Sequence, residues 1–164
     1  NRVGKGRTKT PSMDTMISVA PLTDLYQMVY DSETGYAEAA KKVKTPQLAA
    51  FLYHLAADRT EMRQQLGVAI HRLQPDEDLD QGTVKGELHR AWMNIREALS
   101  ASTDRAVLDE CARGEQYLAK RYSILIEDKD TPSGVLTLLR VQGSKVGVAR
   151  SNIQELEKII IYPN

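Results

Sequence analysis

The sequence contains little cysteine and few aromatic residues. Of its 164 residues one is cysteine, Cys111, and 5% are Phe, Trp or Tyr. A single cysteine excludes an internal disulfide and fits a reducing compartment, so we expect a cytoplasmic protein. We expect Cys111 to be a packed thiol rather than a nucleophile. The low aromatic content disfavours the stacking platforms on which proteins hold single-stranded nucleic acid.

The sequence also lacks an excess of charge of either sign and any long hydrophobic run. Lysine plus arginine and aspartate plus glutamate each number 22, so no net field points to nucleic acid or to a membrane surface. No apolar run is long enough to span a bilayer, and no signal peptide is visible. Hydrophobic content of 41% and charged content of 27% are those of one ordinary globular domain.

Recognisable catalytic and metal motifs are missing as well. The sequence contains no Glu-x-x-His, no Ser–His–Asp set, no phosphate-binding glycine loop and no zinc-knuckle spacing. These absences count against an enzyme without deciding the question.

What the sequence does contain is helical periodicity along most of its length. Apolar residues recur at alternating spacings of three and four, and no strand pattern competes. Pro46 suits the first turn of a helix, and Thr103 or Asp104 suits an N-cap. We therefore predict an all-α bundle domain over residues 21–162, preceded by a flexible basic tail at 1–20. The predicted helices span residues 21–44, 46–73, 83–99, 104–128 and 133–160.

The connection lengths predict the topology of this bundle. The first and second helices are joined tightly and must be antiparallel neighbours, and so must the fourth and fifth. The third helix, about 25 Å long at 1.5 Å per residue, can carry the chain back along the bundle. Two helical hairpins joined by a helical crossover form the ferritin-like up-down bundle.

Charged residues interrupt the apolar stripes of this predicted bundle. Glu33 and Glu115 each stand in a stripe that is otherwise apolar or aromatic, where an uncompensated carboxylate costs several kcal/mol. Arg59 stands in the stripe of the second helix and Arg150 beside the centre of the fifth, whose stripe also contains Gln142. Heights counted from the hairpin turns place Glu33 near Arg59 and Glu115 near Arg150. We therefore predict two buried ion pairs, Glu33–Arg59 and Glu115–Arg150.

A metal centre is the functional alternative to ion pairs. Ferritin-like di-metal sites take inward carboxylates and histidines from the bundle helices. Glu33, Asp58, His89 and Glu115 are the candidate ligands, with iron or another divalent ion as the cofactor. The fifth helix offers no Asp, Glu or His between its start and Glu155, so one wall of such a site lacks ligands.

Several segments of the sequence carry a family resemblance. They are DSETGYAEAA, LAADRTEM, GELHRAWM, ECARGEQYLAKRY and a glutamine in the last helix, in this order. They resemble the uncharacterised bacterial four-helix-bundle family of the ferritin-like superfamily, a domain of unknown function, over about residues 20–157. The resemblance implies a ferritin-like bundle with a metal-handling or stress-linked role.

The resemblance also assigns individual positions. It matches the family at Glu33, Arg59, His89, Glu115 and Tyr122.

Other positions depart from the pattern that the resemblance implies. Asp58 stands where the family has Glu, and Ala112 and Gln116 stand where it has acids. Arg150 stands about where a histidine is typical of the fifth helix. These departures remove ligands, and the last places a cation where a metal ion would contribute its own charge.

Three functions therefore stay open at this stage. The first is a non-catalytic binding or structural bundle, with homo-oligomers open because the side of the second helix with Tyr53, His54 and Asp58 could face solvent or an interface. The second is a divalent-metal (iron) protein with oxidase or storage activity. The third is a DNA-associated bundle that uses the basic tail, although the charge balance disfavours nucleic acid as a partner.

Overall fold

The computed structural model describes residues 18–80, 97 and 103–160. In these residues the chain forms four helices and no strand, so the all-α prediction is confirmed. The predicted helix at 83–99 lies outside the described residues except at Glu97, as does the predicted tail up to residue 17. The four helices are α1 (Ala20–Lys42), α2 (Pro46–Leu73), α4 (Asp104–Glu127) and α5 (Ser133–Ile160).

Local sequence signals explain where these helices begin. Pro21 and Pro46 occupy the first turns of α1 and α2, where a missing backbone N–H costs nothing. Thr103 caps α4, and its hydroxyl accepts a hydrogen bond of 3.3 Å from the amide of Ala106. The predicted helix bounds therefore agree closely with the structure.

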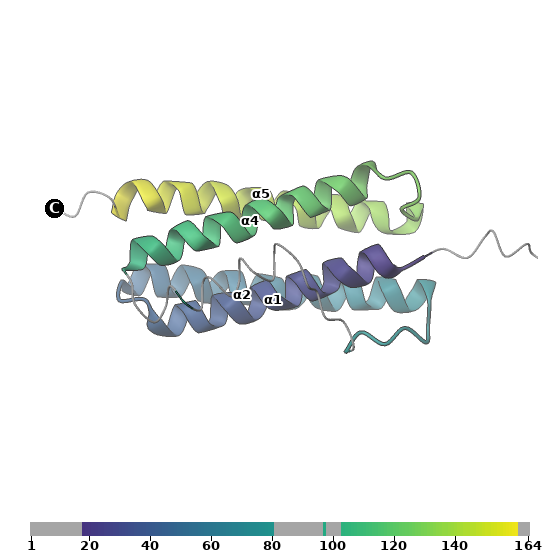
Figure 1. Cartoon of the computed structure of the whole chain (residues 1–164), viewed down its shortest axis with the longest axis horizontal. Helices are drawn as coiled ribbons and strands as arrows, with labels where there is room; N and C mark the ends of the chain where they lie inside the picture. The colour runs from purple at the N-terminus through teal and green to yellow at the C-terminus, as the bar shows by residue number, and fades with distance from the viewer. Residues whose placement is uncertain (1–17, 81–96, 98–102, 161–164) are drawn as a thin grey trace, which may run out of the picture.

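The helices pack as two antiparallel hairpins, α1 with α2 and α4 with α5 (Figure 1). The hairpins associate through α1 against α4 and α2 against α5. Figure 1 shows that α2 ends at the opposite end of the bundle from the start of α4. The end of the first hairpin and the start of the second are expected at opposite ends of the bundle when a long crossover joins two hairpins.

A carboxylate joins the two hairpins at one end of the bundle. Asp104, in the first turn of α4, accepts hydrogen bonds of 2.9 and 2.8 Å from the amides of Lys44 and Thr45 in the α1–α2 turn. These two amides lie at the start of α2, where backbone donors have no partner within the helix. Asp104 therefore supplies acceptors to one hairpin from the other.

The apolar core is divided into two clusters, one toward each end of the bundle. Each cluster draws side chains from all four helices. The cluster nearer the α1–α2 turn consists of Tyr36, Ala39, Ala40, Leu48, Leu52, Leu55, Ala56, Val107, Leu108, Cys111, Ala149 and Ile153. The other consists of Val19, Leu22, Leu25, Val29, Met62, Leu66, Ile70, Leu79, Leu118, Tyr122, Leu125, Val135, Leu139 and Val146.

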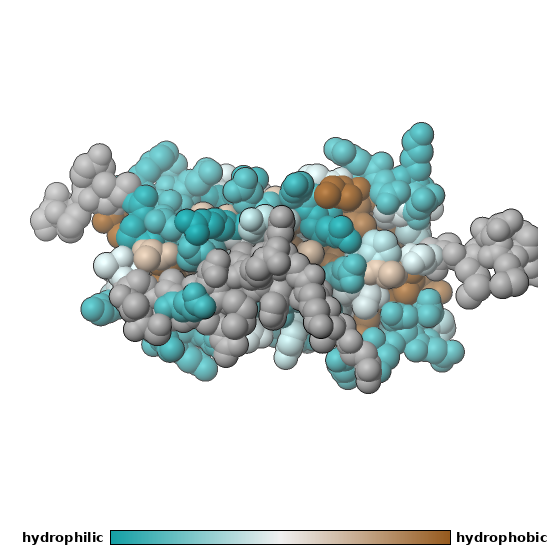
Figure 2. Space-filling model, viewed as in Figure 1, coloured by the Kyte–Doolittle hydropathy of each residue, from teal (hydrophilic) through white to brown (hydrophobic). Residues whose placement is uncertain are grey.

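The outer surface of the bundle is mainly hydrophilic in the view of Figure 2, with isolated apolar spots. This is the distribution expected for amphipathic helices around one core. Among residues 18–80, 97 and 103–160 there is no helix whose length and apolar character would let it cross a membrane.

Candidate functional site

A layer of buried polar side chains lies near mid-depth of the bundle, close to the junction of the two apolar clusters. We call it the polar layer; its members are fully shielded from solvent and come one from each helix: Ser32, Arg59, Glu115 and Gln142. A polar group without partners in such surroundings costs stability, so the contacts of this layer decide what it does.

An ion pair between Arg59 and Glu115 forms the centre of the polar layer. Nη2 of Arg59 donates to both carboxylate oxygens of Glu115, each at 2.7 Å, and both side chains have an exposed fraction of 0%. The pair joins α2 to α4, two helices that belong to different hairpins. Buried charges of this kind are tolerated only when they neutralise each other and are hydrogen-bonded.

Neighbouring side chains complete the surroundings of this pair. The hydroxyl of Tyr36 donates to Oε1 of Glu115, and its ring lies 5.8 Å from Cζ of Arg59. Nη1 of Arg59 lies 3.1 Å from Sδ of Met62. Nε of Arg59 has no hydrogen-bond partner in the part of the chain that the structure describes. Glu115 therefore uses both of its oxygens on donors from α1 and α2.

Gln142 ties α5 into the polar layer. It accepts a hydrogen bond of 2.7 Å from the hydroxyl of Tyr122, on α4. Its amide nitrogen donates to the carbonyl of Met62 and to Oε1 of Gln65, both on α2 and both at 3.0 Å. Hydrogen bonds of Arg59, Glu115 and Gln142 thus connect all four described helices. Ser32 adds no contact between helices, because its hydroxyl donates to the carbonyl of Val29 in its own helix.

Burial sets the protonation of the titratable groups around the pair. Burial raises the pKa of the Tyr36 phenol well above its usual value, and the negative charge of Glu115 adds to the effect. Burial likewise raises the pKa of the Tyr122 phenol and of the Cys111 thiol. Burial acts to lower the pKa of Arg59, but the attraction of Glu115 outweighs it and the pKa rises. The guanidinium of Arg59 therefore stays positive, and around it the phenols of Tyr36 and Tyr122 stay neutral and donate hydrogen bonds while the Cys111 thiol stays inert.

Glu33 forms a second ion pair at the edge of the core. Nε of Arg63 lies 2.6 Å from one carboxylate oxygen of Glu33 and Nη2 3.3 Å from the other, and the two side chains are about one-fifth exposed, 21% and 20%. Nη1 of Arg63 also donates to the hydroxyl of Tyr26 at 3.1 Å, and its Cζ lies 5.2 Å from the ring of Tyr30. This pair joins α1 to α2 within one hairpin.

The predicted partners of the two carboxylates therefore need correction. Glu115 pairs with Arg59 rather than with Arg150, and Glu33 pairs with Arg63 rather than with Arg59. Arg150 is partly exposed and forms no ion pair with any residue that the structure describes. The predicted partners came from counting residues away from each hairpin turn. This count relates positions on the two helices of one hairpin only, so it cannot identify a contact between α2 and α4.

The position of Glu33 also differs from the prediction. The fully buried residue at this level of α1 is Ser32, in a row with Leu25 and Ala39, so Glu33 lies on the flank of the buried stripe. Side chains of a helix lean toward its N-terminus, and α1 and α2 run in opposite directions. Glu33 and Arg63 therefore lean toward each other, which is the signal that could have identified this pair.

Glu33, Asp58 and Glu115, the candidate metal ligands that the structure describes, do not form one cluster. Asp58 faces the outside of α2, where it lies 3.6 Å from His54, and His89 lies outside the described residues. No group of three or more His, Cys, Asp or Glu side chains that could hold a metal ion occurs among residues 18–80, 97 and 103–160. Arg59 lies against the buried carboxylate of Glu115, so the donors described at this depth do not fit a metal centre. Because His89 is not described, the four-residue metal set stays a prediction.

The fold and its centre define the class of this protein. It is an all-α helical bundle with a buried arginine–glutamate pair at mid-depth. The chain belongs to the family "Domain of unknown function (DUF2383)", whose model matches residues 18–128. The matched span includes α1, α2 and α4, while α5 lies beyond it. No curated protein and no solved structure matches the chain.

Proposed function

We propose that this chain is a ferritin-like bundle that acts as a non-catalytic binding, structural or stress-related protein. In this proposal an ion pair occupies the depth at which the ferritin-like arrangement carries its metal ions. Two features support the ferritin-like assignment: the packing of two antiparallel hairpins, and the position of the end of α2 and the start of α4 at opposite ends of the bundle. The observation that carries the proposal is the contact of Arg59 with both oxygens of Glu115.

Electrostatics explains why this contact disfavours a resident metal ion. A divalent ion at Glu115 would have to displace the guanidinium of Arg59 and the phenol of Tyr36. Arg59 stays positive at any physiological pH and has no exposed surface, so it would then face a second cation without screening by water. On the α5 side, Gln142 offers an amide whose groups are already hydrogen-bonded. The centre is better suited to fixing the helices than to chemistry.

Metal analysis and an oxidation assay test this proposal. The chain is purified without chelator, its iron, manganese and zinc are quantified by mass spectrometry, and oxidation of added ferrous iron is followed by absorbance. We expect metal well below one ion per chain and no oxidation above that of buffer. The matched control is Glu115→Gln, which keeps the size of the side chain and should leave both readouts unchanged.

Stoichiometric metal with turnover of ferrous iron would refute the proposal in favour of the iron alternative. Loss of that metal in Glu115→Gln would locate it at the polar layer. Retention would direct attention to ligands outside it, such as His89. Either pattern contradicts a metal-free bundle.

A further inference from the structure

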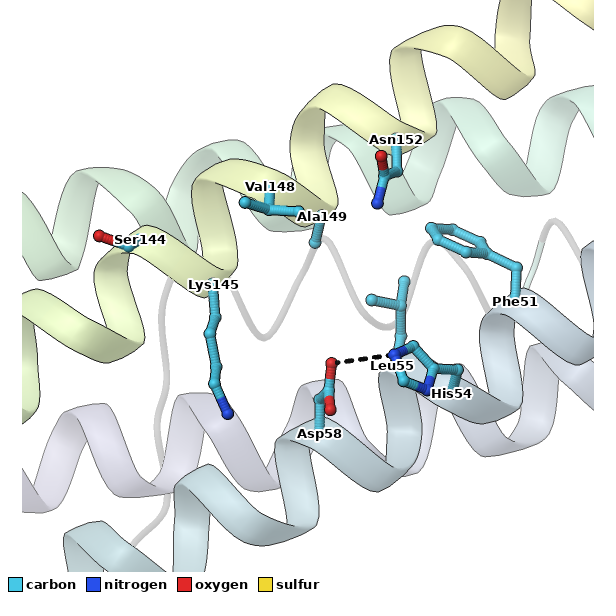
Figure 3. Close-up of a pocket in the computed structure, with 9 residues that line it drawn as sticks. All are labelled: Phe51, His54, Leu55, Asp58, Ser144, Lys145, Val148, Ala149 and Asn152. Atoms are coloured by element: carbon cyan, nitrogen blue, oxygen red, sulfur yellow. Dashed lines mark ion pairs between the residues drawn. The ribbon is translucent and has the colours of Figure 1, made fainter.

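We propose that the face formed by α2 and α5 is the interface through which two copies of this chain pair about a two-fold axis. The two helices leave a groove of about 270 Å³ between them. Its walls include His54, Leu55 and Asp58 on α2, and Lys145, Val148 and Ala149 on α5 (Figure 3). The inference goes beyond the proposed function and does not depend on the polar layer.

This face exposes apolar side chains beside the groove. Val148, on its α5 wall, is 60% exposed, and Val141, two turns earlier on α5, is 50% exposed. Tyr53, next to the α2 wall, is 49% exposed. The floor of the groove is formed by the apolar side chains of Leu55 and Ala149. Burying such a surface against a second apolar surface is favourable.

Opposite charges on the two helices supply complementarity. Between Ser133 and Glu155 the charged residues of α5 are all cationic: Arg140, Lys145 and Arg150. The neighbouring outer side of α2 carries the carboxylates of Asp58 and Glu61. Figure 3 shows the ammonium end of Lys145 directed toward α2, on the side of the groove where Asp58 lies. No ion pair joins Lys145 to another residue within the described part of the chain.

The arrangement of these charges selects one kind of two-fold axis. Asp58 and Lys145 line the same groove, and Figure 3 shows both toward the same end of it, away from Phe51 and Asn152. An axis parallel to the helices places α2 of each copy over α5 of the other at equal height. Asp58 of each copy then faces Lys145 of the partner copy, which gives two equivalent ion pairs. An axis across the helices would instead bring α2 onto α2 and α5 onto α5, and like charges would meet.

The available area suits a stable dimer. A helix of 28 residues, the length of both α2 and α5, is about 42 Å long at 1.5 Å per residue. Two such helices lying about 10 Å apart present roughly 800 Å², which is the area that each partner contributes to a standard interface. The exposed Val148 of one copy then comes over the α2 wall of the other and covers the groove.

The oligomeric state of charge variants tests the interface. We expect the full chain to sediment as a dimer, and Asp58→Lys or Lys145→Glu to raise the dissociation constant at least about tenfold. The double variant Asp58→Lys/Lys145→Glu exchanges the charges across both contacts and should restore the dimer. The matched control is Lys120→Glu, on the exposed face of α4, which should leave the dimer intact. Circular dichroism checks that each variant is folded.

Disulfide trapping tests the geometry. A mixture of chains carrying His54→Cys with chains carrying Val148→Cys should form disulfide-linked heterodimers, because the two positions face each other between copies. Chains carrying Val148→Cys alone should form few linked dimers, and the native Cys111 is buried and does not interfere.

Three results would overturn the proposal. The wild-type chain could remain monomeric at high concentration, or the double charge exchange could fail to restore association in folded protein. Efficient linking of Val148→Cys to itself would place α5 against α5 and so contradict the axis. Each of these outcomes leaves the ion pair of the polar layer unaffected, so the dimer and the proposed function can fail separately.

Discussion

Replacing Arg59 by methionine perturbs the centre of the polar layer most directly. The substitution keeps most of the side-chain volume and removes the guanidinium that contacts both oxygens of Glu115. The carboxylate is then left in a site with an exposed fraction of 0%. Removing one partner of a buried pair costs about 3–5 kcal/mol of unfolding free energy. We expect this loss in Arg59→Met and a similar one in Glu115→Leu.

The double variant shows whether these losses come from the pair itself. Arg59→Met/Glu115→Leu removes both charges together, which in other buried pairs is neutral or stabilising. It also removes the hydrogen bond from the Tyr36 hydroxyl to Glu115, at a cost of about 1–3 kcal/mol. The double variant should therefore be more stable than either single variant, with a coupling energy of at least about 3 kcal/mol.

Urea unfolding followed by circular dichroism measures each free energy from the midpoint and slope. Arg150→Met is the matched control, because Arg150 forms no ion pair within the described residues. Its effect should add to that of Glu115→Leu without coupling. Additive losses for Arg59 and Glu115, or stronger coupling of Glu115 to Arg150, would refute the reasoning.

The turn contact, the helix contacts and the buried thiol give further predictions. Burial acts to raise the pKa of Asp104, but hydrogen bonds from Thr45 and from the Lys44 amide outweigh it and keep this pKa below its usual value. The stability from Asp104 is therefore present above its unfolded pKa of about 4 and is lost as the pH falls through the native pKa. Asp104→Asn should cost about 1 kcal/mol at neutral pH in urea unfolding and flatten the acid side of the stability profile; an unchanged profile would contradict the contact. Gly143→Ala should raise the unfolding free energy by about 0.5–1 kcal/mol, since an added Cβ would meet side chains of α4 at ordinary contact distances of 3.5 and 3.6 Å; a loss would mean closer packing of α4 on α5. Cys111 should resist a thiol-reactive dye in the native chain and react in urea, because it is fully buried and burial raises its pKa; rapid native labelling would argue against this packing.

The helices were predictable because their signals are local. Proline at the start of α1 and α2, a threonine cap on α4 and apolar residues at helical spacing act within a few residues of each other. The buried stripe of α5, including Gln142, follows the same logic and agrees with the prediction. In α1 two overlapping stripes share the apolar pattern, so sequence alone placed Glu33 nearer the centre than it lies.

The sequence could predict that glutamate and arginine side chains form ion pairs in the bundle, but not which residues pair. That buried carboxylates would meet guanidinium groups follows from the cost of burying a charge. Which arginine meets which glutamate depends on how the hairpins are rotated and shifted against each other. Arg59 and Glu115 lie 56 residues apart in the sequence and in different hairpins, so no helical period relates them. The groove between α2 and α5 escaped prediction for the same reason.

The placement of the two charges also determines which assemblies of hairpins are excluded. The α1–α2 hairpin contributes a guanidinium to the centre and the α4–α5 hairpin contributes a carboxylate. If two α1–α2 hairpins associated through these inner surfaces, two guanidinium groups would be buried together, and two α4–α5 hairpins would bury two carboxylates. The mixed pairing neutralises both. In a domain-swapped dimer, the α1–α2 hairpin of one chain must therefore still pack against the α4–α5 hairpin of the other. Such a dimer retains the ion pair between Arg59 and Glu115.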